Sequence, residues 1–334
     1  MIRTACPYCG VGCGVVATPD GRGGAEVIGD VAHPANRGRI CSKGAALGET
    51  LGLEDRLLHP EIDGRRVSWD SALDTVARGF ADVIARHGPD AVAFYVSGQL
   101  LTEDYYVANK LIKGFIGTAN IDTNSRLCMA SSVAGHKRAF GSDTVPGRYE
   151  DFEQADLVVL VGSNLAWCHP VLFQRLIKRK RKVKEALRLV VVDPRPIPLA
   201  KQADCWLRVQ PGTDAALALG LVRCLILDGT YDSDFVRDWT NAAMLVRDDT
   251  GLFLRGCDLD AKAPGHPLIW NEDKEKLEAW NTAAPEPNAS LNGCTLDKEL
   301  VVKTIAGDVK CKTVWRLLIE AVAEYTPEKV AELT

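Results

Sequence analysis

Apolar residues recur every three or four positions between Trp69 and Ile84, which predicts an amphipathic helix with one apolar face. Ser68 is a suitable N-cap, and Gly88-Pro89 is a strong stop signal. Apolar runs of strand length lie at 91–96, 156–161, 188–192 and 205–209, and helical patterns lie at 104–115, 171–182 and 215–227. Strands that alternate with helices predict a doubly wound parallel α/β fold, with its ligand crevice at the carboxyl ends of the strands.

The two ends of the chain follow other patterns. Residues 1–60 are rich in Gly and Cys, with a turn at 19–24 between short β-prone runs, which predicts a small β-rich module stapled by metal. We therefore expect three domains, at 1–60, 61–150 and 151–334. Within the last, the polar stretch from Asp248 to Gly293, with Trp270, Pro285 and Pro287, is expected to be an irregular insertion, and 315–325 a final amphipathic helix.

Composition narrows the class of protein. The 334 residues allow about two domains, and 46% apolar residues suffice for packed cores. A formal charge of -4 gives no global attraction to nucleic acid or anionic lipid, and no apolar run approaches the roughly 20 residues that cross a bilayer. The first residues carry no export signal, which favours the cytoplasm. Eleven cysteines are too few for a disulfide scaffold and odd in number, so clustered ones favour metal ligation.

The strongest chemical signal is the group Cys6, Cys9 and Cys13, followed by Cys41. Three thiolates within eight residues can wrap one cluster, because the intervening glycines let the backbone curl and offer N–H groups to the sulfides. This spacing favours a four-iron four-sulfur cluster. Structural zinc, which usually takes two well-separated Cys-x-x-Cys pairs, and a set of free thiols remain alternatives.

A second signal is the polar loop 124–132 around Cys128, just ahead of a possible helix whose N-terminus would favour a thiolate. A thiolate is a good soft ligand for a heavy metal, but a buried free cysteine is an alternative interpretation of this residue. The remaining cysteines have no such setting and are interpreted as small hydrophobic residues: Cys168, Cys205, Cys224, Cys257, Cys294 and Cys311.

Two further patterns carry less information. Gly10, Gly12 and Gly14 do not form a dinucleotide fingerprint, because the third glycine is misplaced and no adequate strand precedes them. The basic run 178–184 is interpreted as a solvated helix end rather than as a contact for nucleic acid or an acidic partner.

The order of these motifs over nearly the whole chain resembles the molybdopterin oxidoreductases that carry a bis-guanine-dinucleotide molybdenum cofactor. The residues that carry the resemblance are the four cysteines, Cys41-Ser42-Lys43-Gly44, the loop at Cys128, Val161-Gly162-Ser163-Asn164, Asp193-Pro194-Arg195 and Pro211-Gly212-Thr213-Asp214. Within this family, formate dehydrogenases place histidine after the ligand cysteine or selenocysteine, whereas periplasmic and assimilatory nitrate reductases have Cys-Met-Ala-Ser. This chain has Cys128-Met129-Ala130-Ser131, so it is similar to the nitrate reductases, and the missing export signal favours the cytoplasmic assimilatory branch.

The resemblance implies a role for each matching residue. Cys6, Cys9, Cys13 and Cys41 would hold the 4Fe–4S cluster, Lys43 would lie on the electron path to the pterin, and Cys128 would bind molybdenum beside Met129. Asp193 and Asp214 suit guanine, whose N1–H and N2 amine are paired donors for a carboxylate. The implied cofactor contacts are Gln99 and Asn124 near the metal, Val161, Gly162, Ser163, Asn164 and Cys168 toward the pyrophosphate, and Val192, Asp193, Pro194, Arg195, Pro196, Gly212, Thr213 and Asp214 at the nucleotide.

By the same resemblance, the chain reduces nitrate to nitrite with electrons that pass from a donor protein through the cluster to molybdenum. The donor would be a flavoprotein with NADH, a ferredoxin or a flavodoxin. Catalytic subunits of this family are much longer, so the last domain is expected to be truncated at its C-terminus. Formate oxidation on the same cofactor, a zinc-stapled nucleic-acid-binding module and an inactive truncated scaffold remain alternatives, and neither nucleic acid nor a membrane is expected as a partner.

Overall fold

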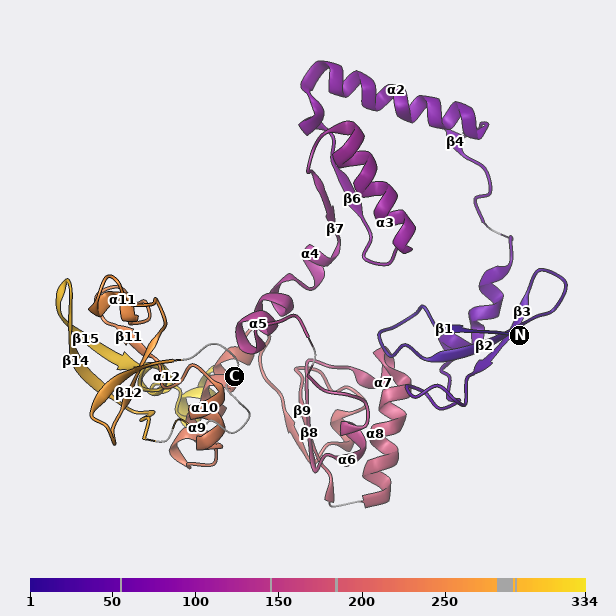
Figure 1. Ribbon diagram of the computed structural model, residues 1–334. Helices are drawn as coiled ribbons and strands as arrows, with labels where there is room; N and C mark the ends of the chain where they lie inside the picture. Colours follow the sequence, from indigo (N-terminus) through magenta and orange to yellow (C-terminus); the bar gives the residue numbers. More distant parts are fainter. Residues whose placement is uncertain (55, 145, 184–185, 281–290, 292) are drawn as a thin grey trace. The chain divides into compact units, whose positions relative to one another are not determined.

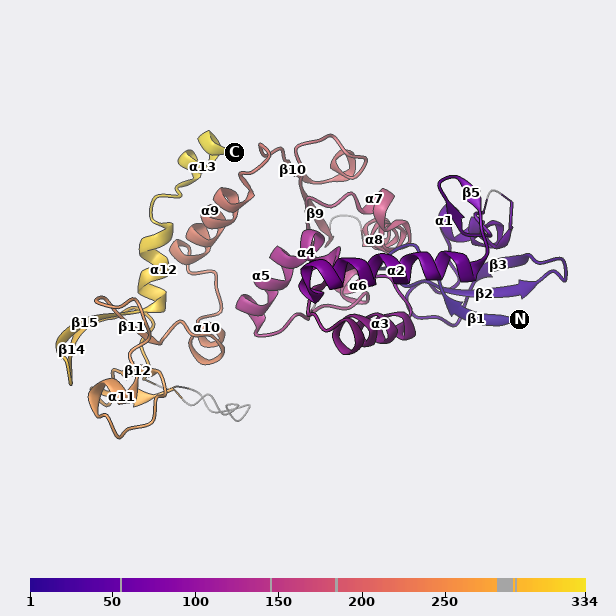
Figure 2. The same cartoon turned by 90° about the horizontal axis from the view of Figure 1, so that it is seen from above.

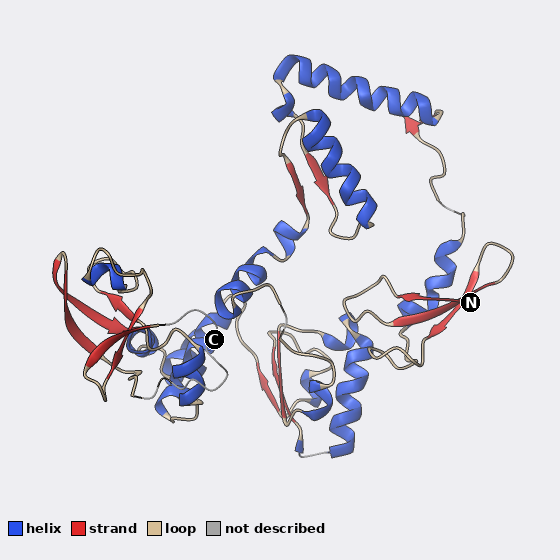
Figure 3. Cartoon of the chain, in the orientation of Figure 1, coloured by secondary structure: helices blue, strands red, loops and turns tan. Residues whose placement is uncertain are grey.

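The computed structural model describes residues 1–54, 56–144, 146–183, 186–280, 291 and 293–334 (Figure 1). The described chain divides into two compact units, one made of residues 1–158 and 164–188 and the other of residues 159–163 and 189–334. Both units contain helices and strands (Figure 3), which confirms the predicted α/β class. None of the helices in the described ranges is long and apolar enough to cross a membrane.

The first unit begins with a three-stranded antiparallel sheet in the order β1-β2-β3, and two of its strands match the β-prone runs of the sequence. Asn36 is 2% exposed and holds the following loop against the sheet, because its side chain accepts from Gly14 N and donates to Gly14 O, both at 2.9 Å. The elements of this module are β1 (Ile2–Ala5), β2 (Gly14–Pro19), β3 (Ala25–Gly29), α1 (Ser42–Ala45) and the 3-10 helix η1 (Ala46–Leu51).

A short hairpin of β4 (Glu61–Ile62) and β5 (Arg65–Arg66) precedes the long helix α2 (Trp69–His87). The predicted cap and stop of this helix are confirmed, because Ser68 Oγ accepts from Ser71 N at 3.2 Å and Gly88 ends the helix with φ 82°. A positive φ of this size favours glycine.

The next segment is a parallel β-α-β unit. The 3-10 helix η2 (Pro89–Ala91) leads into β6 (Phe94–Val96), which pairs in parallel with β7 (Ile121–Thr123). The predicted helix at 104–115 is observed as α3 (Thr102–Asn109) and the π-helix η3 (Lys110–Ile116). The sequence pattern missed β7, because three residues are too few to show a strand period.

The helices α4 (Ser125–Cys128), α5 (Ala130–Phe140) and α6 (Asp151–Gln154) follow. A second parallel sheet has the order β10-β9-β8, formed by β8 (Leu157–Val161), β9 (Arg188–Val192) and β10 (Cys205–Leu207). The helices α7 (Leu165–Cys168) and α8 (Pro170–Val183) connect β8 to β9, and the 3-10 helix η5 (Ala200–Gln202) lies between β9 and β10. These strands and α8 confirm the predicted β-α-β order.

The prediction of an irregular insertion at 248–293 is wrong where the structure describes it. Within this stretch, β12 (Leu268–Asn271) forms an antiparallel hairpin with β13 (Lys276–Ala279). The stretch is flanked by the strands of an antiparallel sheet, in which β15 (Gly307–Thr313) pairs with β11 (Leu245–Arg247) and β14 (Glu299–Thr304). Leu245, Leu254 and Cys311 are fully buried in the core beneath. Short strands with exposed charges gave no clear period, and Pro285 and Pro287 lie outside the described residues.

Three helices of the second unit pack together: α9 (Asp214–Leu227), α12 (Val314–Val322) and α13 (Pro327–Leu333) (Figure 2). Gly220 allows the close approach of α13 to α9, since a Cβ at this position would lie 2.7 Å from Val330 Cγ2. Helices α9 and α12 confirm the predictions at 215–227 and 315–325. The remaining helices are α10 (Ser233–Trp239) and α11 (Gly256–Leu259).

Candidate metal and cofactor site

The structure brings the four predicted cluster cysteines to one small cavity. The loop from Cys6 to Cys13 closes on itself, because Cys6 N donates to Cys13 O at 2.8 Å and Gly12 N donates to Cys9 O at 3.2 Å. Gly12 has φ 63°, a conformation that permits this tight turn. The cavity is lined by Cys6, Tyr8, Cys9, Val11, Cys13, Ile40, Cys41, Gly44, Pro170 and Val171.

The thiols lie close enough to influence one another electrostatically. The pKa of Cys13 is raised to about 11, mainly by burial and in addition by the charges of Cys6, Cys9 and Cys41. Four thiolates of one sign therefore need a positively charged group between them. In the part of the chain that is described, no three His, Cys, Asp or Glu side chains converge on a single ion. A zinc site would need its sulfurs at about 2.3 Å from one ion, an arrangement that the described thiols do not adopt.

Lys43 directly follows the Cys41-Ser42 pair in α1 and is exposed. The next residue, Gly44, is buried, and a Cβ there would lie 3.7 Å from Cys6 Sγ and closer still to Ile40. The short helix therefore packs against the cysteine cavity and leaves the side chain of Lys43 exposed.

A second group of predicted residues meets at the carboxyl edge of the β6–β7 pair. Asn124 Oδ1 accepts from Gly98 N at 2.7 Å, which ties the loop after β6, with Gln99, to the residue after β7. Cys128 and Met129 follow four and five residues later, and both are exposed. The loop predicted around Cys128 is partly the one-turn helix α4, but the predicted position of Cys128 just ahead of a helix, α5, is confirmed.

The nucleotide residues predicted in the second unit lie after successive strands of the parallel sheet. Gly162 and Ser163 follow β8, and Gly162 N donates to Val192 O at 2.9 Å. Asp193 follows β9 and is 4% exposed, and its Oδ1 accepts from Arg195 N at 2.8 Å. This is the edge where ligands bind in open α/β sheets. The residues that lie along it are Val161, Gly162, Ser163, Val192, Asp193, Pro194, Arg195 and Pro196.

The third nucleotide turn, 211–214, leads into α9. Gly212 has φ 92°, and Thr213 occupies the N-cap position. The side chain of Thr213 does not cap the helix, because its Oγ1 donates to Gln210 O at 2.7 Å instead. The exposed Asp214 then begins the helix, whose free N–H groups suit a phosphate or another anion.

Asn164 supplies an independent sign of a ligand. It follows Ser163 and precedes α7, which ends at the exposed Cys168. Its Oδ1 is buried and has no hydrogen-bond partner in the structure. A buried unpaired acceptor costs about 1–3 kcal/mol, so it fits a cofactor that brings a donor. A pterin dinucleotide is rich in such donors.

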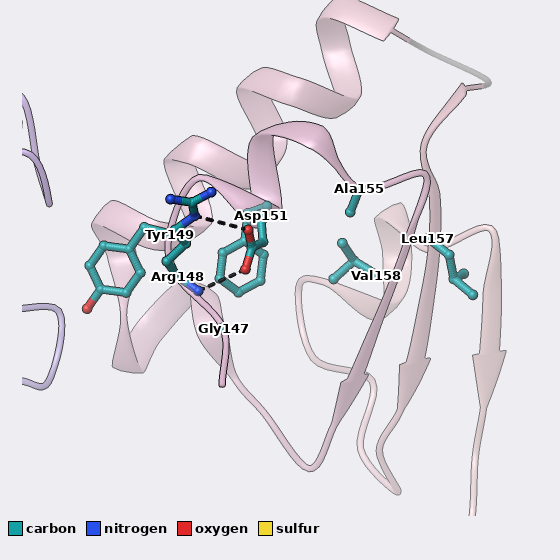
Figure 4. Close-up of a pocket in the computed structure, with 8 residues that line it drawn as sticks. Gly147, Arg148, Tyr149, Asp151, Ala155, Leu157 and Val158 are labelled. Carbon is teal, nitrogen blue, oxygen red and sulfur yellow. Dashed lines mark hydrogen bonds and ion pairs between the residues drawn. The ribbon is translucent and has the colours of Figure 1, made fainter. Parts of the chain in front are cut away.

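The sequence patterns missed an apolar cavity of about 350 Å³ in the first unit (Figure 4). It lies at the amino end of β8, opposite the cofactor edge of that strand, so its position does not match the predicted nucleotide site. Figure 4 shows Tyr149 pointing away from Ala155 and Val158. The cavity is lined by Gly147, Arg148, Tyr149, Asp151, Phe152, Ala155, Leu157 and Val158.

The chain matches known proteins over most of its length. The molybdopterin oxidoreductase family matches residues 56–289, and the molybdopterin oxidoreductase Fe4S4 domain matches residues 1–51. A nitrate reductase from Klebsiella oxytoca is 57% identical over 74% of this chain and 28% of its own length. The alpha subunit of F420-dependent formate dehydrogenase 1 from Methanococcus maripaludis is 35% identical over 72% of this chain and 35% of its own length.

A solved structure shares the fold. Acetylene hydratase from Pelobacter acetylenicus superposes with a TM-score of 0.59 and 26% identity over 71% of this chain and 33% of its own. The chain thus spans about a third or less of the length of these three proteins. The two matching families support molybdenum-molybdopterin and a 4Fe–4S cluster as cofactors. With its cysteine module and parallel sheets in the predicted order, the chain belongs to the molybdopterin oxidoreductase family.

Proposed function

We propose that this chain forms the cluster-bearing part of an enzyme that reduces nitrate to nitrite. The observation that carries the proposal is Cys128-Met129-Ala130-Ser131, which ends α4 and begins α5 at the edge of a parallel sheet. The formate branch has histidine where this chain has Met129. The nitrate reductase from Klebsiella oxytoca is also more similar to this chain than the formate dehydrogenase from Methanococcus maripaludis.

The four cysteines that line one cavity are proposed as the cluster ligands. Hydrogen bonds from peptide N–H groups to the sulfides tune the potential of a cluster, and the glycine-rich loop could supply such groups. Lys43, on the helix that starts after Cys41, is proposed to lie between the cluster and the pterin. Its positive charge would stabilise negative charge on either group.

A molybdenum bis-(molybdopterin guanine dinucleotide) cofactor would supply the two-electron chemistry at nitrate. Cys128 Sγ is proposed as its protein ligand, with Gln99 and Asn124 beside the metal and Met129 shaping the pocket. Asn164 would satisfy its buried Oδ1 on the cofactor, and the buried Asp193 and the exposed Asp214 would bind guanine. The chain's own contribution is to bind, orient and desolvate the cofactor and the anion.

Electrons are proposed to arrive one at a time from a flavoprotein with NADH, a ferredoxin or a flavodoxin. The cluster supports this route, because it accepts single electrons whereas nitrate reduction needs two. An assimilatory role in the cytoplasm stays a prediction of the sequence.

A chimaera tests the proposal, in which residues of this chain replace the matching segment of the Klebsiella oxytoca nitrate reductase. We expect the purified chimaera to form nitrite from nitrate with a reduced dye as donor, and to leave formate unoxidised. Met129→His should lower nitrate reduction, while Cys257→Ala, at a half-buried cysteine outside the site, should not. Oxidation of formate without reduction of nitrate would contradict the proposal and favour the formate branch.

A further inference from the structure

Helix α8 begins at the cysteine cavity. Its first two residues, Pro170 and Val171, line that cavity together with the four cysteines. The first turn of a helix carries partial positive charge on its free N–H groups. Helix α8 therefore presents its electropositive end to the place where the cluster would sit.

Arg175, one turn further along α8, binds the cysteine module with a side chain that is 5% exposed. Its Nη1 donates to Pro34 O at 3.1 Å and to Ala35 O at 3.0 Å, both in the segment between Cys13 and Cys41. Its other nitrogens contact two carboxylates, with Nε at 2.8 Å from Glu153 Oε1 and Nη2 at 3.3 Å from Glu150 Oε1. One guanidinium thus joins three segments of the chain.

Tyr149 fixes the cysteine module at a second point. Its hydroxyl lies 3.0 Å from Gly10 O and 2.9 Å from Val11 O, so its one proton is shared between two carbonyls that lie between Cys9 and Cys13. Its ring packs on Arg175, with the guanidinium carbon 5.7 Å from the ring centroid. The loop that carries three of the four cysteines therefore rests on Tyr149, and Tyr149 rests on Arg175.

The charges of this group are balanced. Arg175 and Arg37 contact the same two carboxylates, Glu150 and Glu153, so the four formal charges sum to zero. The two arginines differ in burial, because the Arg37 side chain is 55% exposed and the Arg175 side chain is 5% exposed. Water screens the charge of Arg37 well and that of Arg175 poorly.

We propose that Arg175 is a positioning residue for the iron–sulfur cluster, one that holds the cysteine loop at the start of α8 and raises the reduction potential of the cluster. The inference rests on the proposed cluster ligands but not on the proposed substrate. Reduction adds one electron to a group already negative from four thiolates. Loss of the Arg175 charge leaves a net negative charge on the partly buried Glu150 and Glu153, against which the cysteine module packs, and this charge disfavours that electron.

The test is a reductive titration of the anaerobically purified chain, with the reduced cluster followed by electron paramagnetic resonance and iron measured on the same samples. For Arg175→Met we expect a tenfold lower ratio of reduced to oxidised cluster at a fixed potential, or about 59 mV in the midpoint of a one-electron couple. Arg175→Lys keeps the charge but loses the several N–H donors of the guanidinium. Its midpoint should differ from that of the parent by less than half of the Arg175→Met shift. Arg37→Met is the matched control, and its shift should be less than a third as large.

Several results would overturn the inference. One is an unchanged midpoint in an Arg175→Met protein that keeps its iron, and another is an equal shift for Arg37→Met. If Arg175→Met lost its iron, Tyr149→Phe would decide, because it keeps the ring and removes only the hydroxyl. We expect the Tyr149→Phe protein to keep its iron and to show an about threefold lower ratio of reduced to oxidised cluster at a fixed potential. An unchanged midpoint in this variant would contradict the positioning role of Arg175. Absence of iron in the parent chain would instead contradict the cluster ligands.

Discussion

The two proposed sulfur sites differ in how much of each site this chain builds by itself. Cys6, Cys9, Cys13 and Cys41 share one cavity, in a loop closed by backbone hydrogen bonds. Cys128 is exposed at the end of a one-turn helix. The proposed cluster would take all its protein ligands from one module, whereas the pterin would supply most ligands of the molybdenum. A cofactor that brings its own metal ligands therefore needs fewer protein ligands held in place by the chain.

The largest expected effect is the loss of the cluster in Cys9→Ser. A serine hydroxyl is a poor substitute for a thiolate in a four-cysteine site, so the brown colour and most of the iron should disappear. Cys224→Ser, in α9 of the second unit, should keep both. Iron per chain and the visible spectrum measure this effect, and a Cys9→Ser protein with full iron content would remove Cys9 from the ligand set.

Substitution of Cys128, at the second site, should lower the rate of nitrate reduction but leave the iron content unchanged. Cys128→Ala in the Klebsiella chimaera should lower the rate of nitrate reduction more than about 100-fold, because changes even to outer partners of metal ligands cost about 10–100-fold. Its iron content should equal that of the parent. Unchanged nitrate reduction would show that Cys128 is not the molybdenum ligand.

The free energy of unfolding should depend differently on pH in the protein with its cluster and in the protein without it. In protein stripped of its cluster, burial raises the pKa of Cys13 to about 11 from an ordinary value of 9.0, so the folded state holds its proton more tightly than the unfolded state. The stabilisation is complete below about pH 9 and is lost as the pH rises toward 11, by roughly 2 kcal/mol.

Cluster-bound thiolates carry no proton, so the loaded protein should lack this component. Burial also raises the pKa of Cys311 to about 11, but this core residue titrates in both forms and cancels in their difference. Urea unfolding between pH 8 and 11 measures the difference. Equal pH slopes in the two forms would contradict the close grouping of the thiols.

The smallest effect is expected at the basic end of α8. Arg181 and Lys182 are exposed, so replacing both with glutamate should leave the iron content and the midpoint of the cluster unchanged. A reductive titration followed by electron paramagnetic resonance, with iron measured on the same samples, tests this expectation. A large loss of iron would show that this run is more than a solvated helix end.

The sequence predicted the long helices and the grouping of the four N-terminal cysteines, because helix periods and cysteine spacing are local patterns. Ser68 and Gly88 placed the ends of α2 correctly, whereas β7, with three residues, was too short to show a period. The sheet of β11, β14 and β15 was missed, because Leu245 and Cys311 meet in its core from distant parts of the chain.

The sequence did not predict which residues hold the cysteine module in place. Arg175 and Tyr149 lie far along the chain from Pro34 and Gly10, and only folding brings their donors to those carbonyls. A lone arginine in a helix pattern carries no signal of such a role. The residue roles at Cys128, Lys43 and the nucleotide edge stay predictions.

Metal analysis of one anaerobic preparation, made in cells that assemble the pterin cofactor, shows whether the four N-terminal cysteines hold an iron–sulfur cluster. We expect about four iron atoms per chain, no zinc, and a colour that bleaches with dithionite. Zinc in place of iron, in a colourless protein, would contradict it.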